Sequence, residues 1–155
     1  MLPNEVAVDS FEGFARRVEP RLRDALSATL GSDAGRDATA EALAYGWEHW
    51  PRVSGMDNPA GYLYMVGRDR GRRLLRRGRI ALMPVDPVRT PWVEPGLPDA
   101  LGQLSESQRV AVMLLYCFQW TMTEVAELLG VTKSTVQSHA ERGLGRLRSE
   151  MGVTL

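Results

Sequence analysis

Seven arginines within residues 68–79 are the most distinctive side chains of this 155-residue chain. Asp69 is the only acidic residue among them, and residues 66–79 carry a net charge of +6. Guanidinium groups bind phosphate oxygens and stack on planar rings, and Tyr62 and Tyr64 precede them with further aromatic faces. A solvated helix face is the usual alternative for a run of charges, but here almost no acid balances the arginines. The segment is typical of a surface that binds nucleic acid, including single strands.

A second group of polar side chains follows the pattern of a helix-turn-helix motif within residues 121–148. Thr121 and Glu124 have the spacing of a capping box that opens a short helix. Gly130 suits a left-handed turn, and Thr132 suits the cap of a second helix. A helical hairpin that only packs is the alternative. The second helix would present side chains suited to the major groove, namely Lys133, Ser134, Thr135, Gln137, Ser138 and Arg142.

Helical signals dominate the rest of the chain, and no strand pattern competes with them. Apolar residues recur at steps of three and four over 11–30, with Ser10 as the N-cap and Pro20 as an expected kink or break. Asn58 and the proline after it begin a helix that we expect over 59–79. The side chains expected to face the core in the various helices include Leu63, Val66, Leu74, Val110, Met113, Leu114, Cys117, Val131 and Val136.

Residues 80–97 contain four prolines, which cannot continue a helix, and this composition predicts an extended linker. The sequence therefore predicts an all-α protein of two small helical domains. The first domain would span residues 1–79, and a helix-turn-helix domain would span 98–155. A further capping box, at residues 105–108, would lie near the start of the second domain.

Composition excludes several classes of protein. The net charge is zero, but it divides into −4 over residues 1–50, +6 over 51–90 and −2 over 91–155. A uniformly basic coat is excluded, whereas a local basic surface is not. The single cysteine, Cys117, allows no internal disulfide and no cysteine-based zinc site. We expect no catalytic cluster, metal or cofactor, no secretory signal or membrane insertion, and a cytoplasmic location.

Both polar groups resemble one family, the bacterial RNA polymerase sigma factors of the sigma-70 family, extracytoplasmic-function group. The segment LPDALGQLSESQRVAVMLLYCFQWTMTEVAELLGVTKSTVQSHAERGLGRLR looks like the fourth conserved region of that family, nearly end to end. The segment NPAGYLYMVGRDRGRRLLRR looks like the second-region helix that reads and melts the −10 element. The resemblance covers residues 11–79 and 98–148, which is most of the chain.

The resemblance implies a role for each half. The N-terminal domain would bind core RNA polymerase through Asp37, Glu41, Leu43 and Trp47. The following residues would contact the −10 DNA and hold an extruded base: Arg68, Asp69, Arg72, Arg73, Arg76 and Arg77. The helix-turn-helix would read the −35 element through the six residues named above. Promoter DNA and core polymerase are the implied partners, and an anti-sigma factor is a further candidate.

The chain also departs from the family pattern. Gln137 stands where a basic residue is frequent, and His139 stands where arginine is frequent. Fewer cations on the recognition helix predict weaker phosphate anchoring at the −35 element. A stand-alone, dimeric helix-turn-helix regulator is the alternative function, but it leaves the arginine-rich helix and the acidic helix without a role. Because the basic charge is local, we expect the isolated protein to bind DNA poorly and to bind it well within a polymerase holoenzyme.

Overall fold

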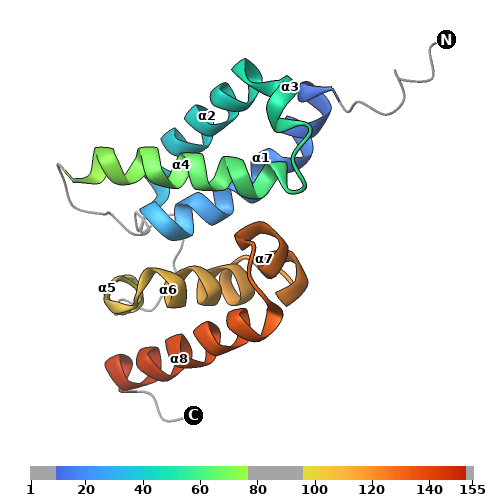
Figure 1. The fold of residues 1–155 in the computed structure, drawn as a ribbon. Helices are drawn as coiled ribbons and strands as arrows, with labels where there is room; N and C mark the ends of the chain where they lie inside the picture. Colours follow the sequence, from blue (N-terminus) through green and yellow to red (C-terminus); the bar gives the residue numbers. More distant parts are fainter. Residues whose placement is uncertain (1–9, 77–95, 153–155) are drawn as a thin grey trace.

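The computed structural model describes residues 10–76 and 96–152, and every regular element in these two ranges is a helix (Figure 1). The predicted all-α fold is confirmed, while Arg77, Arg79 and residues 80–95 of the predicted linker lie outside the described residues. Among the described helices, none is long and apolar enough to cross a membrane. The elements are α1 (Phe11–Leu30), α2 (Ser32–Glu48), α3 (Trp50–Val53), α4 (Pro59–Leu75), α5 (Leu97–Gln103), α6 (Glu106–Val112), the π-helical turn η1 (Met113–Cys117), α7 (Met122–Leu129) and α8 (Lys133–Met151).

The N-terminal half is built from α1, α2 and α4, which pack on one another with the short α3 at one end (Figure 1). Both predicted N-caps form. The Ser10 hydroxyl accepts a hydrogen bond from Gly13 N at 3.2 Å, and Asn58 Oδ1 accepts one from Gly61 N at 3.0 Å. The core of this half holds the buried side chains Phe14, Leu22, Leu26, Leu30, Val53 and Leu63.

Helix α1 runs without interruption through Pro20, so of the kink or split expected there, the split is wrong. Proline removes the hydrogen bond that its N–H would donate to the carbonyl four residues earlier, which belongs to Arg16. Both residues are exposed, and water can therefore satisfy the freed carbonyl. The apolar face of α1 lies on the opposite side, where its burial against α2 and α4 stabilises the continuous helix.

Glycines allow the helices of this half to approach closely. A Cβ atom at Gly35 of α2 would lie 2.6 Å from both the N and the Cα of Ser27 in α1. A Cβ atom at Gly67 of α4 would lie 2.8 Å from Cδ1 of Leu26. Real Cβ atoms do not approach backbone atoms this closely, and the backbone at Ser27 cannot rotate away as a side chain can. The crossing of α1 and α2 therefore requires glycine at position 35.

We expect Gly35→Ala to lower the free energy of unfolding by about 3 kcal/mol, because overpacking against backbone forces the helices apart. Gly145→Ala is a matched control, since Gly145 lies within α8 and nothing lies within 4 Å of an added Cβ atom there. That control should gain roughly 0.5–1 kcal/mol from the higher helix propensity of alanine. Urea unfolding followed by circular dichroism measures both changes, and equal stabilities of the two variants would contradict the close crossing.

The C-terminal half is built from α5, α6, η1, α7 and α8, and its local signals act as predicted. The capping boxes opened by Ser105 and Thr121 both form. Gly130 adopts the left-handed conformation, with φ of 67°, and ends α7. Thr132 Oγ1 accepts a hydrogen bond from Thr135 N at 3.1 Å and caps α8. The helix-turn-helix is therefore confirmed as a structure.

Three expected core positions are instead exposed. Leu74 is 59% exposed and Val131 is 39% exposed, and Cys117 also lies at the surface. The cause at Cys117 is the π-helical turn, in which Phe118 N donates to Met113 O at 2.9 Å, five residues back. The wider turn rotates the chain away from the apolar face. The predictions for these three residues are wrong, although neighbouring groups still raise the pKa of the Cys117 thiol by desolvation.

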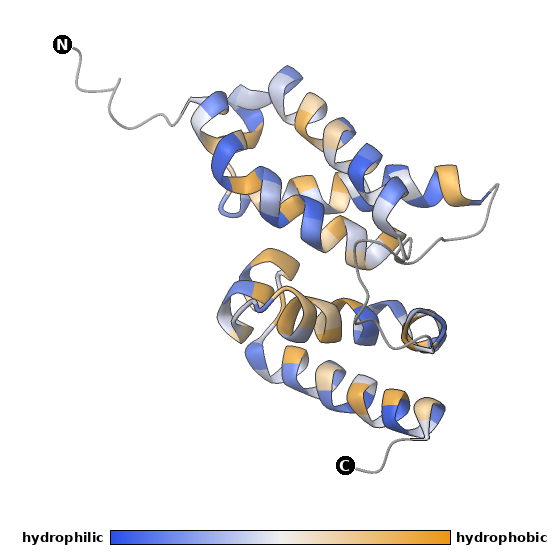
Figure 2. Ribbon diagram, turned by 180° about the vertical axis from the view of Figure 1, so that it is seen from behind, coloured by the Kyte–Doolittle hydropathy of each residue, from blue (hydrophilic) through white to orange (hydrophobic). Residues whose placement is uncertain are grey.

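The two halves pack against each other, with α1 contacting α6 and η1 and α4 contacting α7. Figure 2 shows that hydrophobic positions recur along the helices of both halves, as their amphipathic patterns require. The buried apolar side chains of both halves belong to one cluster, which runs from Phe14 in α1 to Leu147 in α8. In the described structure the two halves therefore share one hydrophobic core.

Candidate nucleic-acid interface

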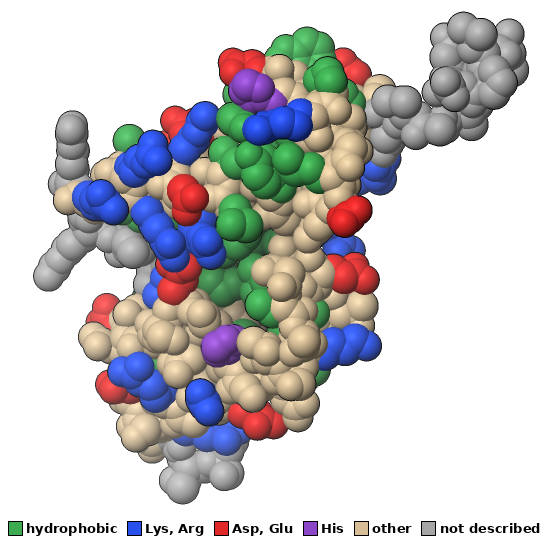
Figure 3. Space-filling view, in the orientation of Figure 1, with side chains coloured by type: hydrophobic (Ala, Val, Ile, Leu, Met, Phe, Trp, Pro, Cys, Tyr) green, Lys and Arg blue, Asp and Glu red, His purple; other side chains and the backbone are tan. Residues whose placement is uncertain are grey.

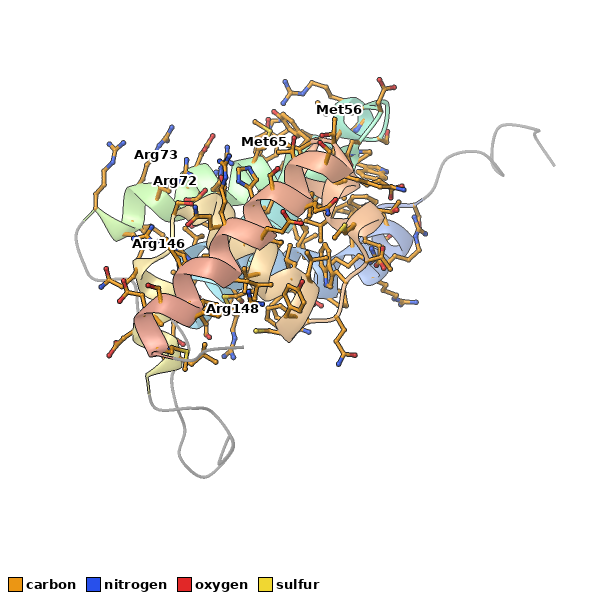
Figure 4. The ribbon with its side chains drawn as sticks, turned by 90° about the horizontal axis from the view of Figure 1, so that it is seen from below. Met56, Met65, Arg72, Arg73, Arg146 and Arg148 are labelled. Carbon is orange, nitrogen blue, oxygen red and sulfur yellow. The ribbon has the colours of Figure 1, made fainter. Side chains whose placement is uncertain are left out.

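The C-terminal part of α4 carries the arginines that the sequence singles out. Figure 3 shows Lys and Arg side chains gathered over this end of α4, with few acidic groups among them. Arg73 and Arg76 are exposed, and Figure 4 shows Arg72 and Arg73 extending from the same stretch of helix. Arg70 lies over the ring of Tyr45 in α2, with 5.3 Å between its Cζ and the ring centroid. The arginines thus spread over several directions around the helix end.

Two of these arginines face the C-terminal half. Arg72 donates a hydrogen bond to the Glu106 carboxylate of α6, and this bond raises the pKa of Arg72 above its ordinary value. Arg68 stacks on Tyr64 at 5.8 Å, and its side chain is 27% exposed. Asp69 lies at the surface, 3.8 Å from Nε of Arg68. Glu106 therefore partly neutralises this surface, which sequence alone does not indicate.

Helix α8 presents most of the predicted groove-reading side chains to solvent. The exposed ones are Lys133, Ser134, Gln137, Ser138 and Arg142. Thr135 differs, because it is half-buried and its hydroxyl lies 2.8 Å from the Thr132 hydroxyl, where it supports the cap. Gln137 donates through Nε2 to Glu141 Oε1 at 3.0 Å. Further along the helix, Arg146 and Arg148 project from α8 (Figure 4).

Helix α2 carries exposed acidic and aromatic side chains. Asp37 and Glu41 are exposed one turn apart, and Trp47 is 60% exposed. The Trp47 ring packs edge-on against Phe11 with 5.6 Å between centroids. Leu43 lies one turn before Trp47 and is half-buried against the core. Ala40, Ala44 and Glu48 are also exposed, between or beside the predicted residues.

A cavity of about 250 Å³ lies where the two halves meet. One wall comes from α4, through Tyr64, Met65 and Arg68. The other walls come from α6 and the helix-turn-helix, and include Ser107, Val131, Val136 and His139. The arginine-rich helix and the recognition helix, which are separate sites in the sequence, therefore line one space. Nothing in the sequence indicates this proximity, because it depends on how the halves dock.

The C-terminal half matches a known family. Residues 96–147 match the model of sigma-70, region 4, a segment that runs from just before α5 to Leu147 in α8. The matched segment makes up about a third of the chain. A search of curated proteins finds no match to the chain.

The whole chain also shares its fold with a sigma factor of solved structure. That structure is a co-crystal of the sigma factor RpoE with the anti-sigma factor NepR from Bartonella quintana, with a TM-score of 0.62. The two sequences are 21% identical, and the match covers 94% of this chain and 98% of the other. The region 4 match supports the resemblance of residues 96–147 to sigma-70 proteins, and the match to RpoE shows that the fold is shared. The individual −10, −35 and polymerase contacts remain predictions.

Proposed function

We propose that this chain is a sigma factor of the sigma-70 family, which binds core RNA polymerase and directs it to promoters, and that each half contacts a different promoter element. The observation that carries the proposal is the exposed polar face of α8 within the region 4 match. This helix begins at a capped N-terminus, where Lys133, Ser134 and Gln137 can reach base edges in a major groove. Reading of the −35 element is the role that this placement supports.

The N-terminal half would recognise and melt the −10 element. Melting requires unstacking, and captured bases offset that cost by stacking on planar side chains and by charge contacts to phosphates. Arg73 and Arg76 are exposed cations at the end of α4, and the aromatic faces nearby belong to Tyr45 and Tyr64. Arg72 would exchange its bond to Glu106 for DNA. No catalytic chemistry by the chain itself is needed, because the polymerase supplies it.

The exposed acidic and aromatic side chains of α2 would bind the polymerase. Asp37 and Glu41 offer carboxylates to a basic partner, and Trp47, further along α2, offers a large exposed apolar surface. Tryptophan is among the residues enriched in binding hot spots. Leu43 would act indirectly, by supporting the helix from the core side.

Size-exclusion chromatography with core RNA polymerase tests the proposal. We expect the chain to co-elute with core enzyme as a stoichiometric complex and to be displaced by excess unlabelled chain. A dimer that binds duplex DNA but never co-elutes with polymerase would instead establish a stand-alone helix-turn-helix regulator.

A further inference from the structure

The cavity of about 250 Å³ that α4, α6 and the helix-turn-helix line has an apolar interior. Its walls include Val110 and Ala111 of α6 and Val136 of α8, whose side chains are almost fully buried. Figure 3 shows hydrophobic side chains recessed between the two halves, with charged groups beside them. An engineered apolar cavity of roughly 150 Å³ binds one benzene molecule. The volume here is therefore sufficient for one aromatic ring with a short polar chain.

A buried donor without an acceptor belongs to Arg68, whose side chain lines this cavity from α4. Nε of Arg68 is buried, and among the described residues it has no hydrogen-bond acceptor. Oδ1 of Asp69 is 3.8 Å from Nε, which is too far for a hydrogen bond. The guanidinium lies over the Tyr64 ring, with 5.8 Å between Cζ and the ring centroid. Because buried donors are nearly always paired, we expect a bound molecule to supply the acceptor.

Two hydrogen-bonding side chains line the same cavity from other walls, Ser107 of α6 and His139 of α8. Within the described part of the chain, neither of these two side chains makes a hydrogen bond. Glu106 also lines the cavity, but its carboxylate already accepts a hydrogen bond from Arg72. The cavity thus combines an apolar interior with a few polar groups that can still bond. That combination is typical of small-molecule sites, whose polar groups fix the orientation of a mostly apolar ligand.

We propose that this cavity binds a small aromatic carboxylate. The carboxylate accepts hydrogen bonds from Nε and a neighbouring N–H of Arg68, because one edge of a guanidinium presents two parallel donors to two carboxylate oxygens. Ser107 and His139 supply further hydrogen bonds to the same group. The aromatic ring occupies the apolar interior, where its removal from water favours binding. Binding at this site does not depend on the proposed function.

A carboxylate suits this cavity better than a phosphate or a neutral group. A phosphate carries a second charge, which would be repelled by the Glu106 carboxylate in the cavity wall. A neutral amide could accept from Nε of Arg68, but it would forgo the attraction between opposite charges. A water molecule could also accept from Nε, but it would leave the apolar interior unfilled. Each of these alternatives makes a different prediction for binding.

The probe is 3-phenylpropanoate, which joins one aromatic ring to a carboxylate through a two-carbon chain. It is titrated into the full chain labelled with ¹⁵N, and NMR follows the backbone amide signals. We expect shifts concentrated at the residues that line the cavity, with a dissociation constant of about 1 mM or tighter for a ligand of this size. The neutral 3-phenylpropanamide and phenyl phosphate should each bind about tenfold more weakly. Acetate, which lacks the ring, should give no localised shifts.

Arg68→Lys tests the recognition of the carboxylate. Lysine keeps the positive charge but lacks the Nε donor and the planar pair of N–H groups, so the variant should bind the probe about tenfold more weakly. Arg70→Lys is the matched control, because Arg70 lies on the same helix, over the Tyr45 ring, and does not line the cavity. It should bind the probe with the affinity of the parent. Circular dichroism checks that both variants are folded.

Val131→Trp tests the location of the site. Val131 lines the cavity and is 39% exposed, so a larger ring can enter the cavity without overpacking a fully buried position. Probe binding should then be lost, because the introduced side chain occupies the space of the ligand ring. Met122→Trp is the matched control, since Met122 is 37% exposed and does not line the cavity. Its affinity for the probe should equal that of the parent, and circular dichroism again checks folding.

A consequence for transcription rests on the proposed function, which assigns Arg68 to the −10 DNA. Arg68 cannot hold the ligand and a DNA strand at once, so the probe should inhibit promoter-specific initiation with core RNA polymerase. At a probe concentration about ten times its dissociation constant, initiation should fall by about tenfold. Val131→Trp, compared with its own activity without the probe, should be insensitive. That comparison also controls for effects of the probe on the polymerase itself.

The binding and transcription results can be distinguished. The carboxylate site is disproved if the parent shows no localised shifts at about ten times the expected dissociation constant. It is equally disproved if the acid and the amide bind alike, or if folded Arg68→Lys or Val131→Trp binds the probe as the parent does. Binding without inhibition of initiation would disprove the competition with DNA. Failure of the parent to initiate in the absence of the probe would disprove the proposed function and leave the binding result unaffected.

Discussion

Replacing Arg72, Arg73 and Arg76 together with alanine will abolish promoter opening while leaving the binding of core RNA polymerase intact. These residues end α4 as cations with exposed side chains, and their loss removes the charge that tracks the DNA backbone. Each lost phosphate contact lowers the salt slope by roughly 0.7–0.9, and each lost stacking partner costs about 1–3 kcal/mol. The combined loss corresponds to a decrease in open complex of about a hundredfold or more.

The fold should tolerate this change. Arg73 and Arg76 are exposed, and the Arg72–Glu106 pair is half-exposed, so its removal has little effect on stability. Permanganate reactivity of melted thymines measures opening, and co-elution with core enzyme measures assembly. The matched control changes the same residues to lysine, which keeps the charge and removes the planar stacking surface. That control should retain the salt slope and only part of the opening. A folded alanine variant that fails to bind polymerase would contradict the assignment of this surface to DNA.

Replacing Trp47 with alanine will weaken the binding of core polymerase by about 30- to 1000-fold, the effect of losing a hot spot worth roughly 2–4 kcal/mol. Trp47 is 60% exposed in the free protein, so its large ring is available to a partner. Asp37→Asn and Glu41→Gln remove charge without changing shape, and they should slow association and reduce its dependence on salt. Titration of labelled protein with core enzyme gives both constants.

Two comparisons make the Trp47 prediction specific. Trp47→Phe keeps an aromatic surface and its contact with Phe11, so it should recover most of the affinity. Glu12→Gln removes an exposed carboxylate from α1 and should leave affinity unchanged. Unaltered polymerase binding by folded Trp47→Ala would show that the polymerase contacts another face.

Local signals were predictable from the sequence because their physical causes are local. Asn58, Ser105, Thr121 and Thr132 each accept a backbone N–H within three residues, and such caps depend on neighbouring residues alone. Gly130 ends α7 in the left-handed conformation for the same reason. The helix-turn-helix could therefore be recognised before its packing was known.

Other features depend on contacts distant in sequence. On α4 the buried stripe runs through Leu63, Gly67 and Gly71 and continues to the half-buried Leu75, whereas an apolar pattern favours Leu74. An apolar pattern does not reveal this stripe, because glycine is buried here without contributing a hydrophobic side chain to the pattern. The π-helical turn likewise changes the phase of the helix before Cys117, and no sequence rule applied to single residues predicts it.

The interface between the halves could not be predicted from the sequence, because it too depends on contacts distant in sequence. Arg109 looks like one surface charge of an amphipathic helix, yet it lies on the same helical stripe as the buried Met113. A charge on an apolar stripe is a usable signal, because a buried arginine must find acceptors. The identity of those acceptors, Ala28 O and Thr29 O, follows only from the docking of α6 on α1.

The zero net charge is the sum of a basic surface on α4 and an acidic excess that includes α2. The described arginines of the positive segment lie in the C-terminal part of α4 and at its C-cap. The acidic excess of residues 1–50 includes the exposed Asp37 and Glu41 of α2. A second observation supports the expectation that the isolated chain binds DNA poorly. Glu106 of α6 is paired with Arg72, so this arginine is not free to contact phosphate. Both reasons predict that polymerase must bind before the chain engages a promoter well.

Transcription in vitro shows whether this chain directs core RNA polymerase to promoters. Core RNA polymerase is incubated with genomic DNA of the source organism, with or without this chain, and the 5′ ends of the transcripts are mapped. We predict that the chain adds a reproducible set of start sites sharing two sequence elements upstream, and that these starts disappear with the Arg72, Arg73 and Arg76 alanine variant. Identical start sites with and without the chain, when it is folded and in excess over core enzyme, would contradict the proposed sigma factor function.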